Sequence, residues 1–336
     1  MARPLRAVII GAGSIGQRHL RNLLALGQEV VAVADPDPVR LGEIRPLVRP
    51  PCVLTRDEGD ALDRAADVVV IASPTHLHVT QARAAVARGR HVFVEKPLSH
   101  TLEGVDALIE EAARAACRVM VACNLRFMGS LQLVKRLLDD GRIGRPLSAH
   151  AQFGYYLPFW RPTRDYRDGY GARRAMGGGI ILDCFHEFDY LAWLLGVPRE
   201  VFAYAGKVSR LEIDTEDSAD VLLSFGDVVA NVHLDYLRRM YRRSCDLIGE
   251  DGVIVWDYVA RSVTVHGKED RQMEVLLDPL NTEPNQMYLD EMLHFLHCVE
   301  TGEAPALDAA GGRRVLEIAL AAKTSAAEGR PVRVGR

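Results

Sequence analysis

Short apolar runs alternate with amphipathic segments along the first third of the chain. The runs are continuous, which is typical of parallel strands that are buried on both faces. The segments between them space their apolar residues three or four positions apart and therefore predict helices. This regular order of strand and helix predicts a parallel, doubly wound sheet. The strands expected from these runs are residues 7–10, 29–35, 67–72, 91–94 and 119–122, with a short strand at 52–54 and helices over 14–26, 39–44, 58–64, 78–88 and 101–116.

The pattern changes after Cys123. Most later strands alternate apolar and polar residues, as antiparallel strands with one solvated face do. Residues 157–179 interrupt them with a long aperiodic stretch, and loops of this length are usually functional or disordered. The expected strands are residues 147–156, 200–209, 218–225, 228–237, 244–248, 252–257 and 262–266, and the expected helices are 131–139, 180–195, 288–300 and 312–328.

The two patterns together define the fold class. We expect an α/β protein with an N-terminal doubly wound parallel sheet and a C-terminal α+β domain built on a largely antiparallel open sheet. The change of pattern gives domains 1–122 and 123–336, and the last helices are expected to pack back on the first domain. A length of 336 residues with 48% hydrophobic residues is sufficient for two well-buried cores.

Charge and cysteine content narrow the expected partners. The net charge of −4 gives no reason to expect nucleic acid or an anionic membrane, and no apolar run reaches the ~18 residues that span a bilayer. The six cysteines are scattered without a C-x-x-C pair, which fits reduced thiols. No signal-peptide pattern precedes the first strand. We therefore expect a cytoplasmic protein that has neither a nucleic-acid nor a membrane partner.

Three glycines follow the first apolar run at the spacing G-x-G-x-x-G. Gly11 would allow a tight turn, Gly13 would let a pyrophosphate approach the backbone, and Gly16 would let the next helix pack closely. Ser14 and Ile15 open that helix, whose free N–H groups and dipole attract phosphate. The motif predicts a dinucleotide-binding site, and the alternative is a bare structural turn.

Asp35 decides which dinucleotide is expected. It lies 19 residues after Gly16, at the end of the second strand, where an acidic residue binds the hydroxyls of the adenosine ribose. A carboxylate at this place would repel the 2′-phosphate of NADP. We therefore favour NAD, although Arg40 offers a cation close by in the sequence.

Three loops should meet at the carboxyl ends of the parallel strands, where open α/β sheets bind their ligands. Besides the glycine turn, these loops are residues 73–78 and 95–97. Lys96 ends a buried strand, and its ammonium group there can donate a proton, the alternative being a structural pair with Glu95. The residues of these two loops that are expected to bind the cofactor are Ser73, Pro74, His78, Glu95 and Lys96.

A second group of candidate residues follows the glycines at 177–179, which would allow a ligand to approach the backbone. Asp183 and His186 are three positions apart in an expected helix and so share one face. A carboxylate can hold sugar-type hydroxyls, and an imidazole can exchange their protons. Zinc held by Cys184, His186 and Glu187 is the alternative, but adjacent residues point to different sides and no second ligand pair is evident. No metal is therefore expected.

These motifs, with Asn124-Leu125-Arg126-Phe127, resemble the glucose–fructose oxidoreductase / inositol dehydrogenase / MocA (Gfo/Idh/MocA) family over nearly the whole chain. The resemblance implies a Rossmann domain and a nicotinamide-dependent oxidoreductase that acts on CH–OH groups of a sugar, cyclitol or related compound. It further implies a cis peptide bond between Lys96 and Pro97, and homodimers or homotetramers formed through the antiparallel sheet.

The resemblance also implies roles for single residues. Lys96 would position and protonate a substrate oxygen, while Asp183 and His186 would bind hydroxyls and serve acid–base chemistry. Asn124 and Arg126 are expected to bind substrate. The chain departs from many members in having the larger pair Cys184-Phe185 just before His186, which affects the expected shape of the pocket.

The aperiodic segment 157–179 favours an anionic substrate, because guanidinium groups pair with carboxylate or phosphate and aromatic rings stack on sugars or bases. Residues 155–167 also resemble a subgroup of bacterial surface-polysaccharide pathways, which implies a nucleotide-activated acidic sugar. The alternative is a solvated or subunit-contacting loop. The segment and its border contain Arg161, Arg164, Arg167, Arg173, Arg174, Tyr156, Trp160, Tyr166 and Tyr170, of which Arg161 and Tyr166 are expected to bind substrate.

The expected function is hydride transfer between a nicotinamide cofactor and the hydroxyl or keto carbon of a sugar-type substrate. One rival is an epimerase or oxidative glycosidase that retains its NAD; it would purify with NAD and show no net change in nicotinamide absorbance. Another rival is a non-enzymatic NAD-binding sensor, which would need no proton shuttle such as Lys96 with Asp183 and His186. The sequence leaves open the substrate, the direction of the reaction and the size of the oligomer.

Overall fold

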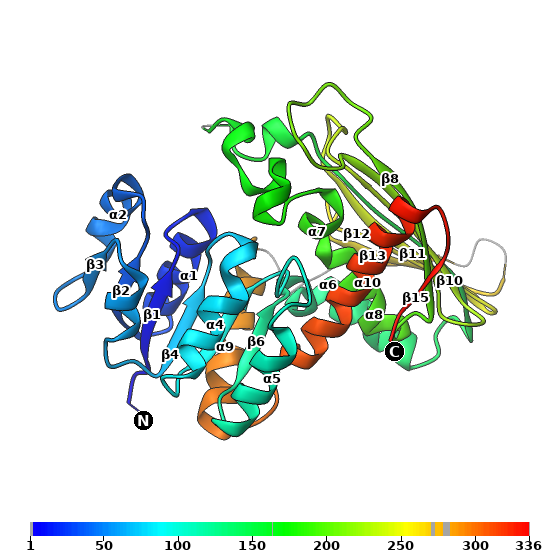
Figure 1. The fold of residues 1–336 in the computed structure, drawn as a ribbon. Helices are drawn as coiled ribbons and strands as arrows, with labels where there is room; N and C mark the ends of the chain where they lie inside the picture. Colours follow the sequence, from blue (N-terminus) through cyan, green and yellow to red (C-terminus); the bar gives the residue numbers. More distant parts are fainter. Residues whose placement is uncertain (1–2, 163, 270–272, 278–282, 336) are drawn as a thin grey trace. The chain divides into compact units, whose positions relative to one another are not determined.

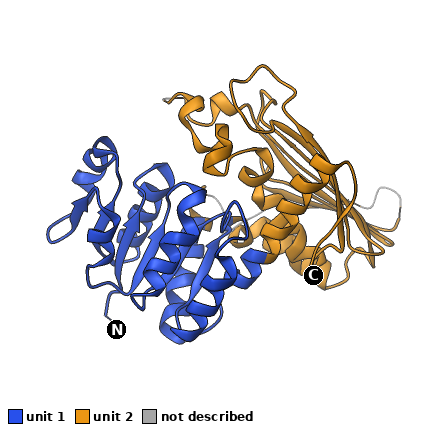
Figure 2. Cartoon of the chain, viewed as in Figure 1, with its two compact units in different colours: residues 1–124, 288–313 blue, residues 125–287, 314–336 orange. Residues whose placement is uncertain are grey.

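Figure 1 shows the computed structural model of the chain, in which residues 3–162, 164–269, 273–277 and 283–335 are described. The chain divides into two compact units, coloured separately in Figure 2. The first unit contains Met1–Asn124 and Tyr288–Arg313, and the second contains Leu125–Met287 and Arg314–Arg336. The last two long helices are divided between the units, so the chain leaves the first unit and later returns to it.

The first unit is built on a six-stranded sheet in the order β3-β2-β1-β4-β5-β6, and every neighbouring pair is parallel. Strand β4 is buried along its whole length, as its continuous apolar run predicts. The parallel sheet is therefore confirmed. Its strands are β1 (Arg6–Ile10), β2 (Glu29–Ala34), β3 (Val53–Thr55), β4 (Val68–Ile71), β5 (His91–Glu95) and β6 (Val119–Ala122), and its helices are α1 (Ser14–Ala25), α2 (Pro38–Ile44), α3 (Glu58–Leu62), α4 (His78–Val86) and α5 (Val105–Arg114), with short 3-10 helices η1 (Arg45–Leu47) and η2 (Thr75–Leu77).

The direction of strand order reverses between β1 and β4 in this sheet. The chain runs outward through β2 and β3 on one side of β1, and through β4, β5 and β6 on the other. Because β1, β4 and β5 are neighbours, the loops at their carboxyl ends lie next to one another. This edge is the position where doubly wound sheets bind ligands.

The second unit is built on a nine-stranded sheet in the order β14-β13-β12-β11-β7-β10-β9-β8-β15. All neighbouring pairs are antiparallel except β7 and β10, which are parallel, so the largely antiparallel sheet is confirmed. Its strands are β7 (Pro146–Gly154), β8 (Glu200–Gly206), β9 (Ser218–Ser224), β10 (Val229–Asp235), β11 (Arg242–Gly249), β12 (Gly252–Asp257), β13 (Ser262–His266), β14 (Met273–Leu277) and β15 (Val332–Arg333). The remaining helices of the chain are α6 (Gly129–Asp139), α7 (Ile180–Asp183), α8 (Phe185–Leu195), α9 (Gln286–Thr301), α10 (Ala309–Glu328) and the 3-10 helices η3 (Asn124–Phe127), η4 (Leu157–Phe159), η5 (Tyr166–Asp168), η6 (Tyr170–Ala172) and η7 (Arg174–Met176).

The structure differs from the sequence prediction in one helix that bears on the site. A single helix over residues 180–195 was expected, but the backbone leaves helical geometry at Cys184 (φ −93°, ψ 45°) and separates α7 from α8. The apolar pattern continues across this break because both helices are buried against the same sheet, so periodicity alone did not reveal it. Strands β14 and β15 also escaped prediction, and the two residues of β15 are too few to form an alternating pattern.

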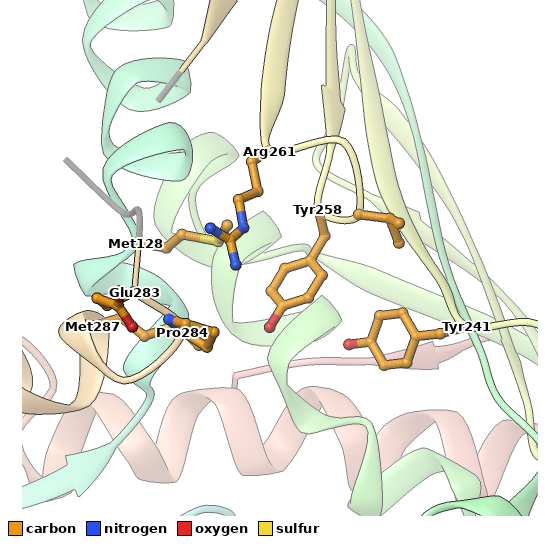
Figure 3. A pocket seen from close by; sticks show the side chains of 8 residues that line it. Met128, Tyr241, Tyr258, Arg261, Glu283, Pro284 and Met287 are labelled. Atoms are coloured by element: carbon orange, nitrogen blue, oxygen red, sulfur yellow. The ribbon is translucent and has the colours of Figure 1, made fainter. Parts of the chain in front are cut away.

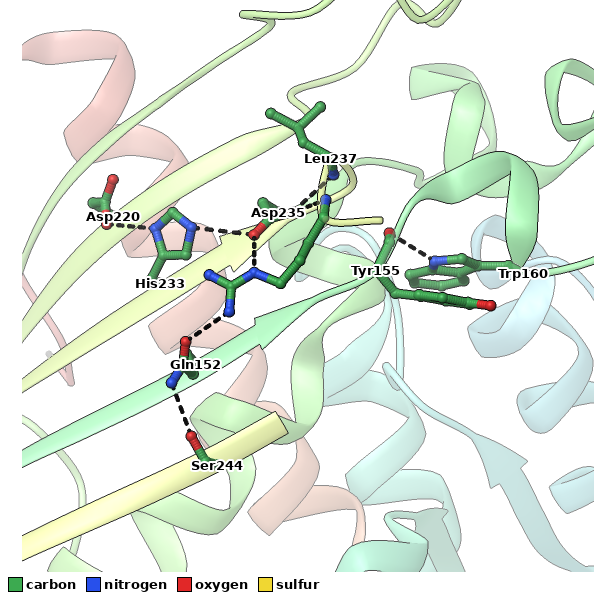
Figure 4. A network of polar contacts seen from close by, with 9 residues as sticks. Gln152, Tyr155, Trp160, Asp220, His233, Asp235, Leu237 and Ser244 are labelled. Carbon is green, nitrogen blue, oxygen red and sulfur yellow. Dashed lines mark hydrogen bonds and ion pairs between the residues drawn. The ribbon is translucent and has the colours of Figure 1, made fainter. Parts of the chain in front are cut away.

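One face of the nine-stranded sheet presents a polar network around His233 of β10 (Figure 4). Its Nδ1 lies 2.7 Å from the Asp220 carboxylate and its Nε2 lies 3.2 Å from the Asp235 carboxylate. Arg238 pairs with Asp235 as well, at 3.6 Å, and donates to the side-chain oxygen of Gln152. The hydrogen bond to Asp235 is the main cause that raises the pKa of His233, while burial opposes it.

This raised pKa predicts a pH-dependent contribution of His233 to stability. The contribution is fully present below the pKa of an unfolded histidine and is lost as the pH rises through the higher folded pKa. We expect His233→Asn to lower the free energy of unfolding more at pH 6 than at pH 9, measured by urea unfolding. His150→Asn, which replaces an exposed histidine of the neighbouring strand β7, is the control. A His233 effect that is equal at both pH values would contradict this prediction.

Candidate active site and cofactor site

The glycine turn after β1 has the geometry that a dinucleotide site needs. Gly11 has φ +97°, and a Cβ there would lie 2.6 Å from the carbonyl carbon of Ala72. A Cβ on Gly16 would lie 1.9 Å from the carbonyl oxygen of Gly11, so helix α1 packs directly on the turn. A Cβ on Gly13, by contrast, would face open space. The outer two glycines are thus required by packing, and the middle one leaves room for a phosphate.

Helix α1 begins at Ser14, with Gly13 as its N-cap, and the structure describes no side-chain cap for it. Its first backbone N–H groups are therefore available to a ligand, together with the positive end of the helix dipole. Both features fit the pyrophosphate of a dinucleotide. The residues of this loop meet the requirements of NAD binding.

Asp35 is fixed beside the same turn. It is only 2% exposed, and one carboxylate oxygen accepts a hydrogen bond from the N–H of Ala12 at 2.7 Å. The other accepts from the N–H of Asp37 at 2.9 Å, and Arg40 lies 3.5 Å from the first. A cavity of about 470 Å³ begins at Pro36, the residue after Asp35. Its other lining residues are Arg56, Asp57 and Glu58.

The position of Asp35 predicts discrimination between the two nicotinamide dinucleotides. Like charges brought together cost several kcal/mol, so we expect NADH to bind at least about tenfold more tightly than NADPH. Asp35→Ser should reduce this ratio, whereas Asp63→Ser, at an exposed carboxylate of the same unit, should leave it unchanged. Dissociation constants from nicotinamide fluorescence would measure both effects. Tighter binding of NADPH by the natural chain would contradict the prediction.

Two buried histidines hold the chain on either side of Lys96. His19 of α1 contacts the carboxylate of Glu95 through Nε2 at 2.7 Å. His78, at the start of α4, has Nδ1 2.9 Å from the carbonyl oxygen of Pro97 and Nε2 2.9 Å from the carbonyl oxygen of Ser73.

Burial lowers the pKa of His78, while its contacts to these two acceptor oxygens act in the opposite direction. His78 thus joins the loop after β4 to the loop after β5. The Lys96–Pro97 peptide bond is cis, as the resemblance implied.

Asp183 lies at the end of α7 and is buried. The hydroxyl of Tyr170 donates to one of its carboxylate oxygens, and the hydroxyl of Tyr236 donates to the other at 2.8 Å. Burial is the main cause that raises the pKa of Tyr236 well above its ordinary value, so this hydroxyl keeps its proton. Tyr170 was expected only as part of the aperiodic segment, without a link to Asp183, and Tyr236 was not among the expected site residues.

His186 lies in the first turn of α8 and is 7% exposed. The expectation that it shares a helix face with Asp183 was wrong, because the break at Cys184 places the two residues on different helices. Both nevertheless flank the same break. Among the described residues, no three His, Cys, Asp or Glu side chains come together as a metal site would require.

The glycines before α7 have a structural reason that the sequence did not reveal. A Cβ on Gly178 would lie 2.2 Å from the carbonyl oxygen of Tyr170. Gly179 has φ +110°, and a Cβ there would lie 2.3 Å from the Glu216 carboxylate. These glycines therefore admit other parts of the chain, and their presence does not require a ligand.

Besides Lys96, Asp183 and His186, four residues were expected to bind substrate: Asn124, Arg126, Arg161 and Tyr166. The structure gives each of them a different environment. Arg126 donates to the Asp189 carboxylate through two nitrogens, at 2.7 Å and 3.0 Å, and its guanidinium lies over the ring of Trp193. Asn124 is buried at the start of η3. The remaining two belong to the aperiodic segment: Tyr166 accepts a hydrogen bond from the N–H of Glu212, and Arg161 lies 6.0 Å from the ring of Tyr170.

Three other arginines of the aperiodic segment are paired with carboxylates or backbone carbonyl oxygens of the protein. Arg167 pairs with Asp165 and, at 3.1 Å, with Glu212. Arg173 and Arg174 donate to backbone carbonyl oxygens of Arg167 and Asp214. The segment is thus held by ion pairs and hydrogen bonds, some within it and some to Glu212 and Asp214, while Arg161 lies near the ring of Tyr170.

The chain matches two family models. Residues 5–123 match the model described as "Oxidoreductase family, NAD-binding Rossmann fold", and residues 131–255 match the "GFO/IDH/MocA C-terminal domain". The myo-inositol 2-dehydrogenase of Thermotoga maritima is 30% identical over 98% of both chains. The scyllo-inositol 2-dehydrogenase (NAD(+)) of Bacillus subtilis is 27% identical over 99% of this chain and 97% of that protein.

Solved structures share the fold over the full length. Levoglucosan dehydrogenase in complex with NADH and levoglucosan aligns with a TM-score of 0.89 at 23% identity, over 99% of this chain and 100% of that one. The WlbA dehydrogenase of Bordetella pertussis, in complex with NADH and UDP-GlcNAcA, aligns with a TM-score of 0.86 at 22% identity, over 100% and 99%.

A parallel sheet with a glycine turn and a carboxylate after β2, followed by an open mixed sheet, defines the class of two-domain, NAD-dependent oxidoreductases that act on CH–OH groups. The chain belongs to the Gfo/Idh/MocA family. Its cofactor is NAD. None of the helices in the described ranges is both long and apolar enough to cross a membrane.

Proposed function

We propose that the protein oxidises a secondary hydroxyl of a sugar or cyclic polyol, or reduces the corresponding ketone. The observation that carries this proposal is the arrangement at the break between α7 and α8. There a buried carboxylate, Asp183, is held by two tyrosine hydroxyls close in sequence to the buried imidazole of His186. The family and the inositol dehydrogenase relatives support the same class of substrate.

The proposed roles follow from the chemistry of each side chain. When bound, NAD supplies the acceptor or donor of the hydride. His186 takes the hydroxyl proton during oxidation, since an imidazole exchanges protons near neutral pH. Asp183 orients that hydroxyl by accepting a hydrogen bond, and Lys96 holds the substrate oxygen with its ammonium group. The cofactor is held by the glycine turn from Gly11 to Gly16, by Asp35, and by the loops after β4 and β5. The first unit is therefore the cofactor domain, and the second is the substrate domain.

A second candidate keeps the reaction but makes the substrate anionic, as a sugar acid or nucleotide-activated sugar. Arg161 favours it, because its guanidinium lies over the ring of Tyr170, which contacts Asp183. Against it, the guanidinium groups of Arg167, Arg173 and Arg174 already contact a carboxylate or backbone carbonyl oxygens of the protein. The neutral substrate is therefore the leading candidate.

The dependence of kcat/KM on salt separates the two candidates. With NAD, we expect oxidation of myo-inositol or glucose to change less than about twofold between low and high ionic strength, because no substrate charge is screened. An anionic substrate steered by arginine would instead lose efficiency as salt rises, and Arg161→Gln would remove that loss while Arg164→Gln would not. Glucuronate and a UDP-linked sugar acid serve as charged probes. Absence of NAD reduction with every neutral and charged compound would contradict the proposed function.

We further propose a homodimer or homotetramer assembled through the nine-stranded sheet. Phe202, Tyr204, Leu222 and Val229 belong to neighbouring strands and are all more than 40% exposed. An exposed apolar patch on an open sheet is a common interaction surface. Sedimentation of the natural chain and of Tyr204→Lys would test this, and a monomer at micromolar concentration would contradict it.

A further inference from the structure

A cavity of about 410 Å³ lies in the second unit, and its wall includes none of the residues proposed above to bind substrate or cofactor (Figure 3). Two turns contribute to it, one after β12 and one before α9. Its volume is within the range of small-molecule sites, and methionine and aromatic side chains form much of the wall. The lining residues are Met128, Tyr241, Tyr258, Val259, Arg261, Glu283, Pro284 and Met287.

Two tyrosines give this cavity polar groups that face inward. The rings of Tyr241 and Tyr258 are 5.5 Å apart between centroids and tilted by 38°. In Figure 3 both hydroxyls point toward the side where Pro284 lies. Within the described residues, no hydrogen bond engages either phenol oxygen. Burial raises the pKa of Tyr241, so its hydroxyl keeps a proton to donate. An inward-facing donor without a protein partner is satisfied when a ligand oxygen enters.

The turn after β12 is held rigidly beside these rings. One carboxylate oxygen of Asp257 accepts from the N–H groups of Val259 and Ala260, and the other pairs with Arg242 at 2.6 Å. Arg261 closes the turn with φ +50°, a conformation that is rare outside glycine and frequent at binding sites. The backbone of this turn is therefore held by hydrogen bonds where it borders the cavity, which lowers the entropic cost of binding.

The cavity adjoins the first turn of α8 through a short chain of contacts. Tyr241 is two residues from Arg243, whose Nε donates to the Glu187 carboxylate at 2.9 Å. Glu187 follows His186 directly in the first turn of α8. The guanidinium of Arg243 also lies 5.7 Å from the ring of Tyr258, so Arg243 connects the cavity wall to α8, while the wall itself includes neither Asp183 nor His186.

This combination of groups matches a polyhydroxylated ring. The faces of a pyranose are apolar and stack on tyrosine, and its hydroxyls both accept and donate hydrogen bonds. Phenol hydroxyls and a carboxylate complement such a periphery, while Met128 and Met287 adapt to its outline. We propose that the cavity is a subsite for a second sugar ring, so that the protein acts on a glycoside whose reacting ring lies at His186. The proposal rests on the proposed function for that reacting ring.

Binding to the NADH-loaded full chain tests the subsite without any turnover. The probes are melibiose and galactinol, with glucose and myo-inositol as their single-ring counterparts, observed by saturation-transfer NMR. We expect saturation on both rings of at least one glycoside. Val259→Trp, which fills the rim of the cavity from a position that is 57% exposed, should abolish it on the galactosyl ring alone. Val208→Trp, at a site outside the cavity that is 63% exposed, is the control.

Hydroxyl deletion refines this test. Tyr258→Phe should weaken binding of the glycoside by about three- to tenfold, the usual effect of one lost hydrogen bond, while Tyr204→Phe should not. The single-ring counterparts should bind equally well to all variants. Three results would overturn the proposal of a sugar subsite. They are the absence of glycoside binding, loss of saturation on both rings together in Val259→Trp, and saturation of uridine in place of the sugars.

Turnover then separates the subsite from the proposed function. In Val259→Trp, kcat/KM for the glycoside should fall at least about tenfold, with less than twofold change for the single-ring compound. Equal losses for both would overturn the subsite and leave the proposed function intact. Ring-specific binding without NAD reduction by any compound would overturn the proposed function while the subsite stands.

Discussion

Replacing Lys96 by alanine is expected to lower kcat by about 10²–10⁴-fold and to leave the dissociation constant of NADH nearly unchanged. Lys96 directly follows β5, at the edge where the carboxyl ends of β1, β4 and β5 lie together. His19 contacts Glu95 and His78 contacts Pro97, so the backbone on both sides of Lys96 is held in place. The long side chain therefore extends from a fixed position. Steady-state kinetics and nicotinamide fluorescence would measure the two quantities separately.

One control variant and two contrary outcomes make the Lys96 result interpretable. Lys135→Ala removes a lysine that pairs with Asp139 on the surface of α6, and it should have no effect on kcat. A Lys96→Ala variant that keeps more than about a tenth of the natural activity would mean that Lys96 is structural, because the loss of an acid–base group costs far more. Weaker NADH binding with unchanged kcat would assign it to the cofactor alone.

His186→Asn is expected to lower kcat by a similar factor and to flatten one limb of its pH profile. Asparagine approximates the shape of the imidazole but does not titrate, so the variant separates proton exchange from packing. The profile of kcat against pH between 5 and 10 is the measurement. His297→Asn, at a histidine of α9 whose side chain is 54% exposed, is the control. Survival of both limbs in His186→Asn would show that another group is the titrating base.

The parallel sheet could be predicted from sequence because its signals are local. Each buried strand is a continuous apolar run, and the glycine turn follows β1 directly. The break at Cys184 could not be predicted in this way. At this break Asp183 is held by Tyr170 and Tyr236, which are 13 and 53 residues distant in the sequence. Apolar periodicity does not report such tertiary hydrogen bonds.

The candidate site shows the same limit. Residue type and spacing singled out Asp183 and His186, but the glycines before them proved to accommodate the chain itself. Arg126 was expected to bind substrate because of its motif, while the structure pairs it with Asp189. A single sequence does not reveal which carboxylate a guanidinium will meet, since that depends on packing between distant segments.

Helix α8 has a consequence for how the second unit folds. Its Glu187 and Asp189 are almost completely buried, and each meets an arginine from elsewhere, Arg243 of β11 and Arg126 of η3. A buried carboxylate that lacks its partner costs about 3–5 kcal/mol. The helix therefore gains little by docking before β11 and η3 are in place, and it loses much if either departs. These three elements should form and melt in one cooperative step, so that partly folded species with α8 docked alone do not accumulate.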